Sequence, residues 1–292
     1  WSNNLHPIKS SASNFGNTGL YETPNARFMG PASLRINFSS SYPFEYTSLT
    51  ATPFSWVEAT YRYTEIKNKN YGQSFYSGNQ SLKDKGFDLK VLIRNEERFF
   101  PAVSVGLRDI AGTGLFSSEY IVSTKRIGNF DISVGLGWGL LGSADNISNP
   151  FKDFDDSFID RNTEQGEGGK FSFKSWFSGK TALFGGLEYD LKRYGLRFKA
   201  EYDTSKPYEN GQVPYKPKTD INFGFTYHYL NNIPFADHGA LLDPPTADVS
   251  ARCLSFLKQQ NNPDSDFSIN KGLKYLLSEQ EDDGSWYGRW GT

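Results

Sequence analysis

Apolar and polar residues alternate with a period of two along most of this chain, from about residue 32 to residue 229. In the stretch "ASLRINFS", Leu34, Ile36 and Phe38 share one face of an extended chain. The same alternation recurs in "WVEATYRYTEI", "FDLKVLIRN", "AVSVGLRD", "FDISVGLGWGLLG", "YGLRFKAEYD" and "DINFGFTYHY". Turn-forming stretches such as "IGNFD", "KRYG" and "YENGQ" separate these segments. The pattern predicts at least seven antiparallel strands, each with one apolar and one polar face.

Two environments can receive the apolar face of such a sheet. It can fill the interior of a soluble barrel or sandwich, or it can face lipid while the polar face lines a lumen. Large Tyr, Phe and Trp side chains near the strand ends favour lipid, because aromatic residues gather at membrane interfaces. In either case, the long polar segment that begins "NPFKDFDDSF" at Asn149 is expected to be an extended loop or a plug.

Beyond residue 229 the apolar residues recur with the period of an α-helix. The apolar stripes are Val249, Cys253, Leu254 and Leu257 in one segment, and Ile269, Leu273, Leu276 and Leu277 in the next. Thr246 is the expected N-cap of the first helix, and the second is expected to end near Gln280. This change of period predicts two regions, 1–229 and 230–292.

Composition narrows the classes of function. The sequence has 292 residues and a formal net charge of −2, which offers no basic field for nucleic acid. It contains no run of about eighteen apolar residues, so no transmembrane helix is predicted, although a membrane β-barrel remains compatible. The single cysteine, Cys253, and three scattered histidines predict no disulfide scaffold, metal site or cofactor. The first residue, Trp1, indicates that a leader has been removed or that the sequence is a fragment.

Several blocks in the strand-rich region resemble one family in the same order. They are "FGNTGLYETPNARFMG", "GLRDIAGTGLFSSEYIVSTKRIGNFDISVGLGWG", "NPFKDF", "SWFSGKTALFGGLEYD" and "LRFKAEYDTSKPY". They look like the YjbH-type family of outer-membrane β-barrel lipoproteins or porin-like proteins associated with exopolysaccharide production. The resemblance covers about residues 14–228. It implies a mainly β, antiparallel, partial outer-membrane-type barrel, with the membrane and polysaccharide or secretion proteins as partners, and no catalytic residues.

The end of the chain resembles a different family. "LNNIPFADHGALLDPPTADVSARCLSFL" and "KGLKYLLSEQEDDGSWYGRWG" are similar to bacterial squalene–hopene cyclases, over about residues 230–292. The second block resembles their QW repeat, with Gln280, Gly284 and Trp286 at its three positions. The resemblance implies a structural role for this repeat, which ties together the helices of an α/α barrel.

Four further positions match functional ones in the cyclases. The resemblance implies that Trp290 faces the cavity, where an indole can stabilise a cation. It places Asp243, Asp248 and Arg252 in a polar cluster that supports the catalytic acid. From the residues alone, the two acids are equally compatible with a helix N-terminus and the arginine with a solvated side chain.

The motif "DFDD", Asp153 to Asp156, is similar to the acidic motif with which cyclases protonate an alkene. Its "NPFK" context matches the barrel family instead, and strand-like sequence separates it from "DPPT". We interpret it as a solvated loop or a weak divalent-cation site.

Three hypotheses follow for the whole chain: an envelope barrel, a triterpene cyclase, or a join of two incomplete proteins. The favoured interpretation joins an outer-membrane barrel for exopolysaccharide production or secretion to a cyclase fragment that carries no catalysis. The alternative is a squalene–hopene cyclase represented by its C-terminal fragment alone. The barrel would belong in the outer membrane and the cyclase-like tail at the cytoplasmic membrane.

Overall fold

The computed structural model describes residues 11–161, 175–191, 196–207, 216, 218–227, 247–259 and 265–286. The chain divides into two compact units, Trp1–His228 and Tyr229–Thr292, and each is described by itself. Among the described residues, no helix combines the length and apolar character needed to cross a membrane.

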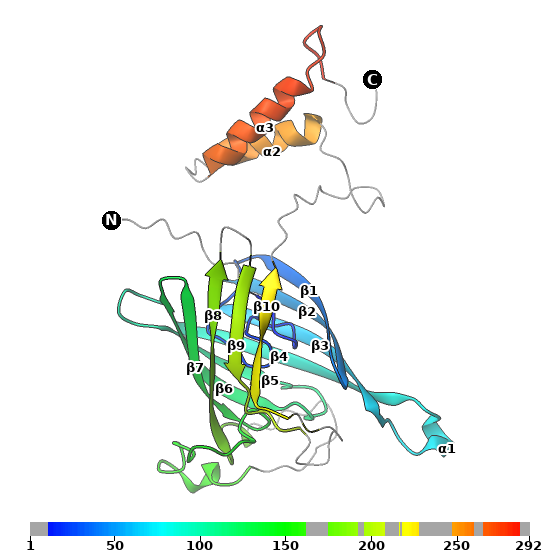
Figure 1. The fold of residues 1–292 in the computed structure, drawn as a ribbon, viewed down its shortest axis with the longest axis vertical. Coiled ribbons are helices and arrows are strands. Elements are labelled where there is room, and N and C mark those ends of the chain that lie inside the picture. The colour runs from blue at the N-terminus through cyan, green and yellow to red at the C-terminus, as the bar shows by residue number, and fades with distance from the viewer. Residues whose placement is uncertain are drawn as a thin grey trace. The chain divides into compact units, whose positions relative to one another are not determined.

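The first unit is one antiparallel sheet in which strand order follows chain order (Figure 1). Its strands are β1 (Ser33–Ser41), β2 (Phe44–Phe54), β3 (Val57–Asn70), β4 (Ser81–Arg94), β5 (Ala102–Arg108), β6 (Ser118–Ile127), β7 (Phe130–Trp138), β8 (Thr181–Leu191), β9 (Leu196–Tyr202) and β10 (Ile221–Tyr227). The mainly β, antiparallel prediction is confirmed. The sheet curls back on itself, but β1 and β10 do not pair in the described structure, so it is not closed.

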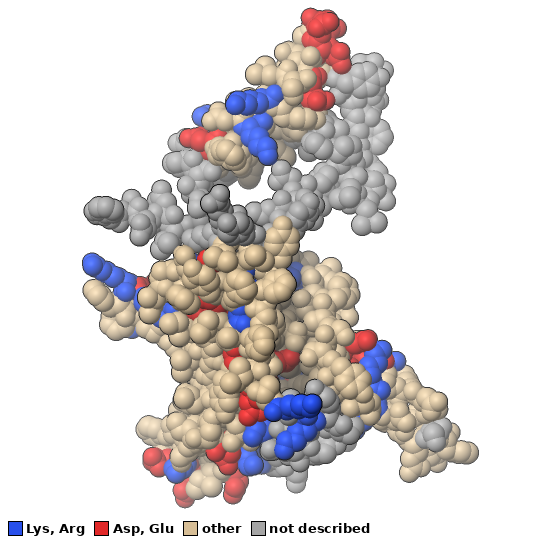
Figure 2. All heavy atoms as spheres, viewed as in Figure 1, with Lys and Arg blue, Asp and Glu red and all other residues tan. Residues whose placement is uncertain are grey.

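The sheet turns its polar face inward and its apolar face outward. On β3, Glu58, Thr60 and Arg62 are buried, whereas Tyr61 between them is exposed. At the two edges the outward apolar side chains are the most open, with Phe38 75% and Phe223 85% exposed. The outside of this unit seen in Figure 2 consists largely of uncharged residues. Of the two environments that the sequence left open, a soluble apolar interior does not describe this sheet.

Connections differ in length between the two ends of the sheet. At one end, residues 55–56 join β2 to β3 and residues 128–129 join β6 to β7. At the other end, residues 109–117 join β5 to β6 and residues 139–180 join β7 to β8. The β3–β4 connection, also at this end, contains the short helix α1 (Ser74–Ser77).

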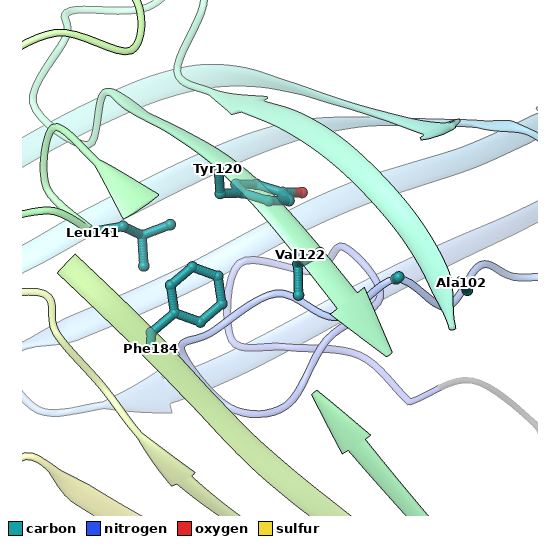
Figure 3. Packing of buried hydrophobic residues seen from close by; sticks show 6 residues of the cluster. Ala102, Tyr120, Val122, Leu141 and Phe184 are labelled. Atoms are coloured by element: carbon teal, nitrogen blue, oxygen red, sulfur yellow. The ribbon is translucent and has the colours of Figure 1, made fainter. Parts of the chain in front are cut away.

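Two small apolar clusters lie inside the curl. One comprises Phe15, Tyr46, Ile66, Phe116 and Leu140, and the other Ala26, Ala102, Tyr120, Val122, Leu141 and Phe184. Figure 3 shows Tyr120, Leu141 and Phe184 of the second cluster close together. Each cluster includes one residue from the segment before β1, Phe15 or Ala26, so that segment lies within the curl.

The glycines that alternate along the strands make room for aromatic rings of neighbouring strands. A Cβ added to Gly106 would lie 2.1 Å from Cζ of Tyr120, and one added to Gly135 would lie 2.4 Å from Cζ of Phe184. These rings therefore lie flat over backbone that carries no side chain, which allows close packing between β5 and β6 and between β7 and β8.

The second unit contains α2 (Ala247–Gln259) and α3 (Asp266–Ser278), which confirms the two predicted helices. They pack on each other where Leu254 covers Gly272: a Cβ there would lie 2.6 Å from a Leu254 methyl carbon. The expected N-cap, Thr246, lies outside the described residues. The second helix ends at Ser278, close to its predicted end. Much of the apolar stripe stays open, including Leu273 and Leu277.

Substituting Gly106 by alanine should destabilise the sheet by about 1–3 kcal/mol, because the new methyl group forces the Tyr120 ring out of its packed position. Urea unfolding of the full chain in detergent would measure the loss. Gly30→Ala is the control, since its nearest neighbour would be Ser33 Oγ at 3.7 Å. Equal stabilities of the two variants would contradict the packing role of Gly106.

Candidate functional site

The interior of the curled sheet is lined by charged side chains, which we call the inner wall. They share the inward face of their strands, and all but Arg35 are buried. The inner wall comprises Arg35, Glu58, Arg62, Asp84, Asp88, Lys90, Arg108, Asp131, Glu188, Asp190, Arg197, Lys199 and Glu201. Bases and acids are nearly balanced, six against seven, so most of these charges can be neutralised by pairing.

Residues 11–27, which we call the N-terminal insert, occupy the space that the inner wall surrounds. Two of its turns are closed by hydrogen bonds within the insert: Ser13 N–H donates to the Asn17 carbonyl at 2.8 Å, and Leu20 N–H donates to the Thr23 carbonyl at 2.9 Å. A Cβ on Gly16 would lie 1.7 Å from Ser48 Oγ on β2, and its φ of +92° also requires glycine. The described insert pairs with no strand of the sheet, although it forms two isolated bridges within itself.

A buried ion pair holds the middle of the insert. Glu58 accepts from the Thr18 N–H and from the Thr18 hydroxyl, both at 2.6 Å. Lys90 Nζ lies 3.1 Å from the Glu58 carboxylate and donates to the Thr18 carbonyl at 3.0 Å and the Arg27 carbonyl at 2.7 Å. Each charge of the pair is also hydrogen-bonded to the insert, so removing the insert would leave each with only part of its hydrogen bonds unless another polar group replaced it.

Glu201 on β9 binds three successive peptide groups of the insert. Its carboxylate accepts from the N–H groups of Tyr21, Glu22 and Thr23 at 3.0, 2.8 and 3.1 Å, and also from the Thr23 hydroxyl at 2.8 Å. Converging backbone N–H groups of this kind form an anion-binding nest. Here the anion is a buried side chain of the sheet and the nest belongs to the insert.

Lys199 and Glu188 hold the remaining turn of the insert. Lys199 Nζ donates to the carbonyls of Gly19 and Leu20 at 3.1 and 2.9 Å, and lies 3.7 Å from Glu188. Glu188 accepts from the Ser11 hydroxyl at 2.8 Å. Lys90 and Lys199 therefore bind carbonyl groups of the insert, and Glu58, Glu188 and Glu201 bind its N–H and hydroxyl groups.

Arg27 ends the insert with a bidentate ion pair to Asp131 on β7, with N–O distances of 2.8 and 2.5 Å. It also contacts Glu96, between β4 and β5, at 2.7 Å. A planar guanidinium paired with a carboxylate in this way fixes orientation as well as charge. Arg27 thus anchors the exit of the insert toward β1.

Arg62 lies on β3, on the same inward face as Glu58, with its guanidinium 5.1 and 4.7 Å from the ring centres of Phe15 and Phe116. The nearest carboxylates, Asp84 and Asp88, are 3.7 and 3.8 Å away. The charge is stabilised by ring faces and by longer-range attraction rather than by close ion pairs.

Burial raises the pKa values of three carboxyl groups: Glu22 in the insert, and Asp109 and Asp203 just beyond the ends of β5 and β9. Burial, and then the charges of Asp203 and Glu201, raise the pKa of Glu22 to about 8. Burial, and then the charge of Glu201, raise the pKa of Asp203 to about 7. Burial and the charge of Asp84 raise the pKa of Asp109 to about 6.

The residues predicted from the cyclase resemblance lie in the second unit. Gln280 donates from its side-chain amide to the Gly284 carbonyl at 2.8 Å, and the Trp286 indole N–H donates to the Leu276 carbonyl at 2.6 Å. Gly284 has a φ of +84°, as the turn requires. The structure therefore brings the three QW positions Gln280, Gly284 and Trp286 together in one turn after α3.

The other cyclase-like positions are not assembled by the described structure. Asp243 and Trp290 lie outside the described residues. Asp248 and Arg252 lie within α2, but the positions of their side chains are likewise outside the described part.

The motif "DFDD" is an exposed loop, in agreement with its interpretation as solvated. Asp155 caps the short 3-10 helix η1 (Asp156–Phe158) by accepting from the Ser157 N–H at 2.8 Å. In the described portion of the chain, no three His, Cys, Asp or Glu side chains are grouped to hold a metal.

The segment expected to be a loop or a plug is, where described, a loop between β7 and β8. Phe151 stacks on Trp138 with ring centres 5.4 Å apart, and Arg161 pairs with Glu119 at 2.6 Å. The N-terminal insert fills the interior instead. Sequence reasoning used the block "FGNTGLYETPNARFMG" as a family marker and missed this role, although its lack of alternation and its many small residues were a usable signal.

An antiparallel sheet with a charged inward face, filled by its own N-terminal segment, defines the class of the first unit. The chain belongs to the family described as "Exopolysaccharide biosynthesis protein YbjH", whose model matches residues 11–238. It is 38% identical over 222 residues to the uncharacterized lipoprotein YjbH of Escherichia coli, covering 76% of this chain. The match spans 32% of that relative's length.

The end of the chain matches the squalene-hopene cyclase C-terminal domain over residues 220–292. Over 63 residues it is 68% identical to the squalene-hopene cyclase of Schizosaccharomyces japonicus, and over 67 residues it is 64% identical to that of Zymomonas mobilis. These matches cover 22% and 23% of this chain and 10% of each enzyme. No solved structure matches. The predicted combination of two families in one chain is confirmed.

Raising the pH from 6 to 9 should destabilise the first unit. Glu22 and Asp203 have folded pKa values above those of the unfolded chain, so the folded state binds more protons between about pH 4 and pH 8, and stability falls as pH rises through this window. Each carboxyl contributes at most about 1.4 kcal/mol per pH unit. Urea unfolding at several pH values measures the slope.

Glu22→Gln should flatten that slope, whereas Asp155→Asn, on an exposed loop, should leave it unchanged. An undiminished slope in Glu22→Gln would show that this carboxyl is not the group that titrates.

Proposed function

We propose that the strand-rich region is part of an outer-membrane β-barrel that acts in exopolysaccharide production or secretion, with its apolar face in lipid. The observation that carries the proposal is that large apolar side chains of most strands point outward, together with the charged inner wall. The Escherichia coli relative is named a lipoprotein, which supports an envelope location, and the family description supports the link to exopolysaccharide.

Water is an unfavourable environment for this exterior. Ile36, Phe38 and Phe225 are among many large apolar side chains that the sheet leaves open. Soluble monomers rarely expose continuous apolar surface on this scale, because each side chain would be stabilised by transfer out of water. A hydrocarbon environment provides that transfer, while the inward charges avoid lipid entirely.

A barrel in lipid has no unpaired strand edges, because lipid offers no partners for backbone N–H and C=O groups. The proposal therefore includes further strands, or a further pairing, between β1 and β10. The relative in Escherichia coli is about three times as long as the region it shares with this chain, which supplies ample sequence for such strands.

The lengths of the connections suggest an orientation. Outer-membrane barrels have short periplasmic turns and longer extracellular loops. We therefore place the end with residues 55–56 and 128–129 toward the periplasm, and the end with residues 109–117 and 139–180 toward the outside.

Introducing arginine at Val134, the central outward residue of β7 and 49% exposed, distinguishes lipid from water. In lipid the charge should cost about 2–4 kcal/mol. On a water-facing surface the same substitution should change stability by at most about 0.5 kcal/mol. The measurement is urea unfolding of the full chain in phosphatidylcholine vesicles, with Asn129→Arg in an exposed turn as control. Equal stabilities of the two variants would overturn the membrane proposal.

We further propose that the cyclase-like tail does not catalyse cyclisation in this chain. The acidic motif at residues 153–156 lies in the other unit, exposed on a loop, where its carboxyls are solvated. An ordinary carboxylic acid, with a pKa of about 4, is far too weak to protonate an alkene. The hypothesis that the chain is an artificial join of two incomplete proteins stays a prediction. A transcript continuous across codons 220–240 in the source material would contradict it.

Incubating the full chain with squalene in detergent should give no cyclic triterpene above background by gas chromatography, because no strong acid is assembled. Product that disappears on Asp155→Asn would show that the exposed motif supplies the proton after all.

A further inference from the structure

The inner wall recognises the N-terminal insert chiefly through its main chain. Lys90, Lys199 and Arg108 donate to backbone carbonyls, with Arg108 Nη2 2.8 Å from the Glu22 carbonyl. Glu58 and Glu201 accept from backbone N–H groups. Contacts of this kind depend on the spacing of polar groups and very little on side-chain identity, so another chain with suitable donors and acceptors can make them.

The wall also offers acceptors and donors side by side. Glu58 and Lys90 lie 3.1 Å apart, and Glu188 and Lys199 lie 3.7 Å apart. A hydroxyl group both donates and accepts, so one hydroxyl can bind to both members of such a pair. Hydroxyl groups occur at regular spacing along a glycan chain.

We propose that the inner wall is a binding site for a hydroxyl-rich glycan chain and that residues 11–27 are its releasable internal occupant. The choice of a glycan rests on the proposed function in exopolysaccharide production. The release of the insert does not rest on that proposed function, because it is argued from the contacts between the insert and the sheet alone.

The insert can leave without breaking a strand ladder, because it pairs with no strand and its hydrogen bonds to the sheet are made by side chains. Turns such as Ser13–Asn17 and Leu20–Thr23 need no sheet partner. Its buried apolar anchors are Phe15, Leu20 and Ala26. The wall charges that it now satisfies would be hydrated, or bound by a ligand, once it is gone. A ligand that binds the emptied wall therefore shifts the equilibrium toward release.

The experiment measures access to the insert in the full chain, in detergent. Cys253→Ser removes the native thiol, which is exposed, and Ser13→Cys places a reporter in the insert, where Ser13 is buried and its hydroxyl bonds only within the insert. The rate of labelling by a water-soluble maleimide reports release. Circular dichroism verifies that each variant keeps its strands.

Glu201→Gln weakens the binding of three insert N–H groups and should speed labelling roughly tenfold, as expected for the loss of a charge-assisted hydrogen-bond cluster. Glu45→Gln makes the same change on an exposed outward side chain of β2 and should leave the rate unchanged. If Glu201→Gln loses its strands, Lys199→Gln replaces it. An unchanged rate in the folded variant overturns release of the insert.

Two soluble probes, a neutral glucan oligosaccharide and a uronic-acid oligosaccharide, are then added to the reporter chain with its wall intact. Saturable acceleration of labelling by either one supports the glycan site. If Glu201→Gln speeds labelling but neither oligosaccharide does, the glycan assignment is overturned. Neither result depends on the Val134→Arg measurement, so failure of the membrane proposal and failure of this one are distinguishable.

Discussion

Buried charge is the constraint on which the first unit depends. The pleat of each strand sends every second side chain inward, and on this sheet those side chains are Asp, Glu, Lys and Arg as well as Ser and Thr. A buried charge without partners is strongly destabilising, so each must be paired or hydrogen-bonded. The wall charges pair partly with one another, as Glu58 does with Lys90, and partly with the N-terminal insert. The curl of the sheet and the path of the insert therefore depend on each other, because both are needed to satisfy these charges.

The strands could be predicted from the sequence because period two is a strong local signal. All the quoted segments form strands, but β2, β6 and β8 were not among them. In β2 the outward residues include Glu45 and Thr47, so the apolar contrast between its faces is weak. In β8 the adjacent Gly185 and Gly186 interrupt the alternation. Period two also says nothing about which face points inward, since either face of a curled sheet can be concave. Which face points inward depends on contacts between strands far apart in the sequence, and a local pattern does not contain that information.

The site was harder to predict than the fold. Residues 11–27 have no periodicity, and their role depends on partners up to 187 residues away, as between Ala12 and Lys199. Gln280, Gly284 and Trp286 were found through the resemblance to the QW repeat, and their contacts are local, within residues 276–286. Motifs whose partners are close along the chain can therefore be predicted from sequence. A binding surface assembled from single residues on several strands cannot.

The two units place opposite demands on their surroundings. The sheet exposes apolar side chains over its outer face and keeps its charges inside, whereas α2 and α3 leave one apolar stripe open on a small helical pair. In their curated relatives the cyclase residues make up about a tenth of the enzyme. A helix pair gains little from burial alone and depends on neighbouring helices to cover its stripe. The local hydrogen bonds of the QW turn persist without those neighbours because they are made within a few residues. The local geometry that the cyclase family shares can thus form within a short segment of chain, because its hydrogen bonds join residues within 276–286.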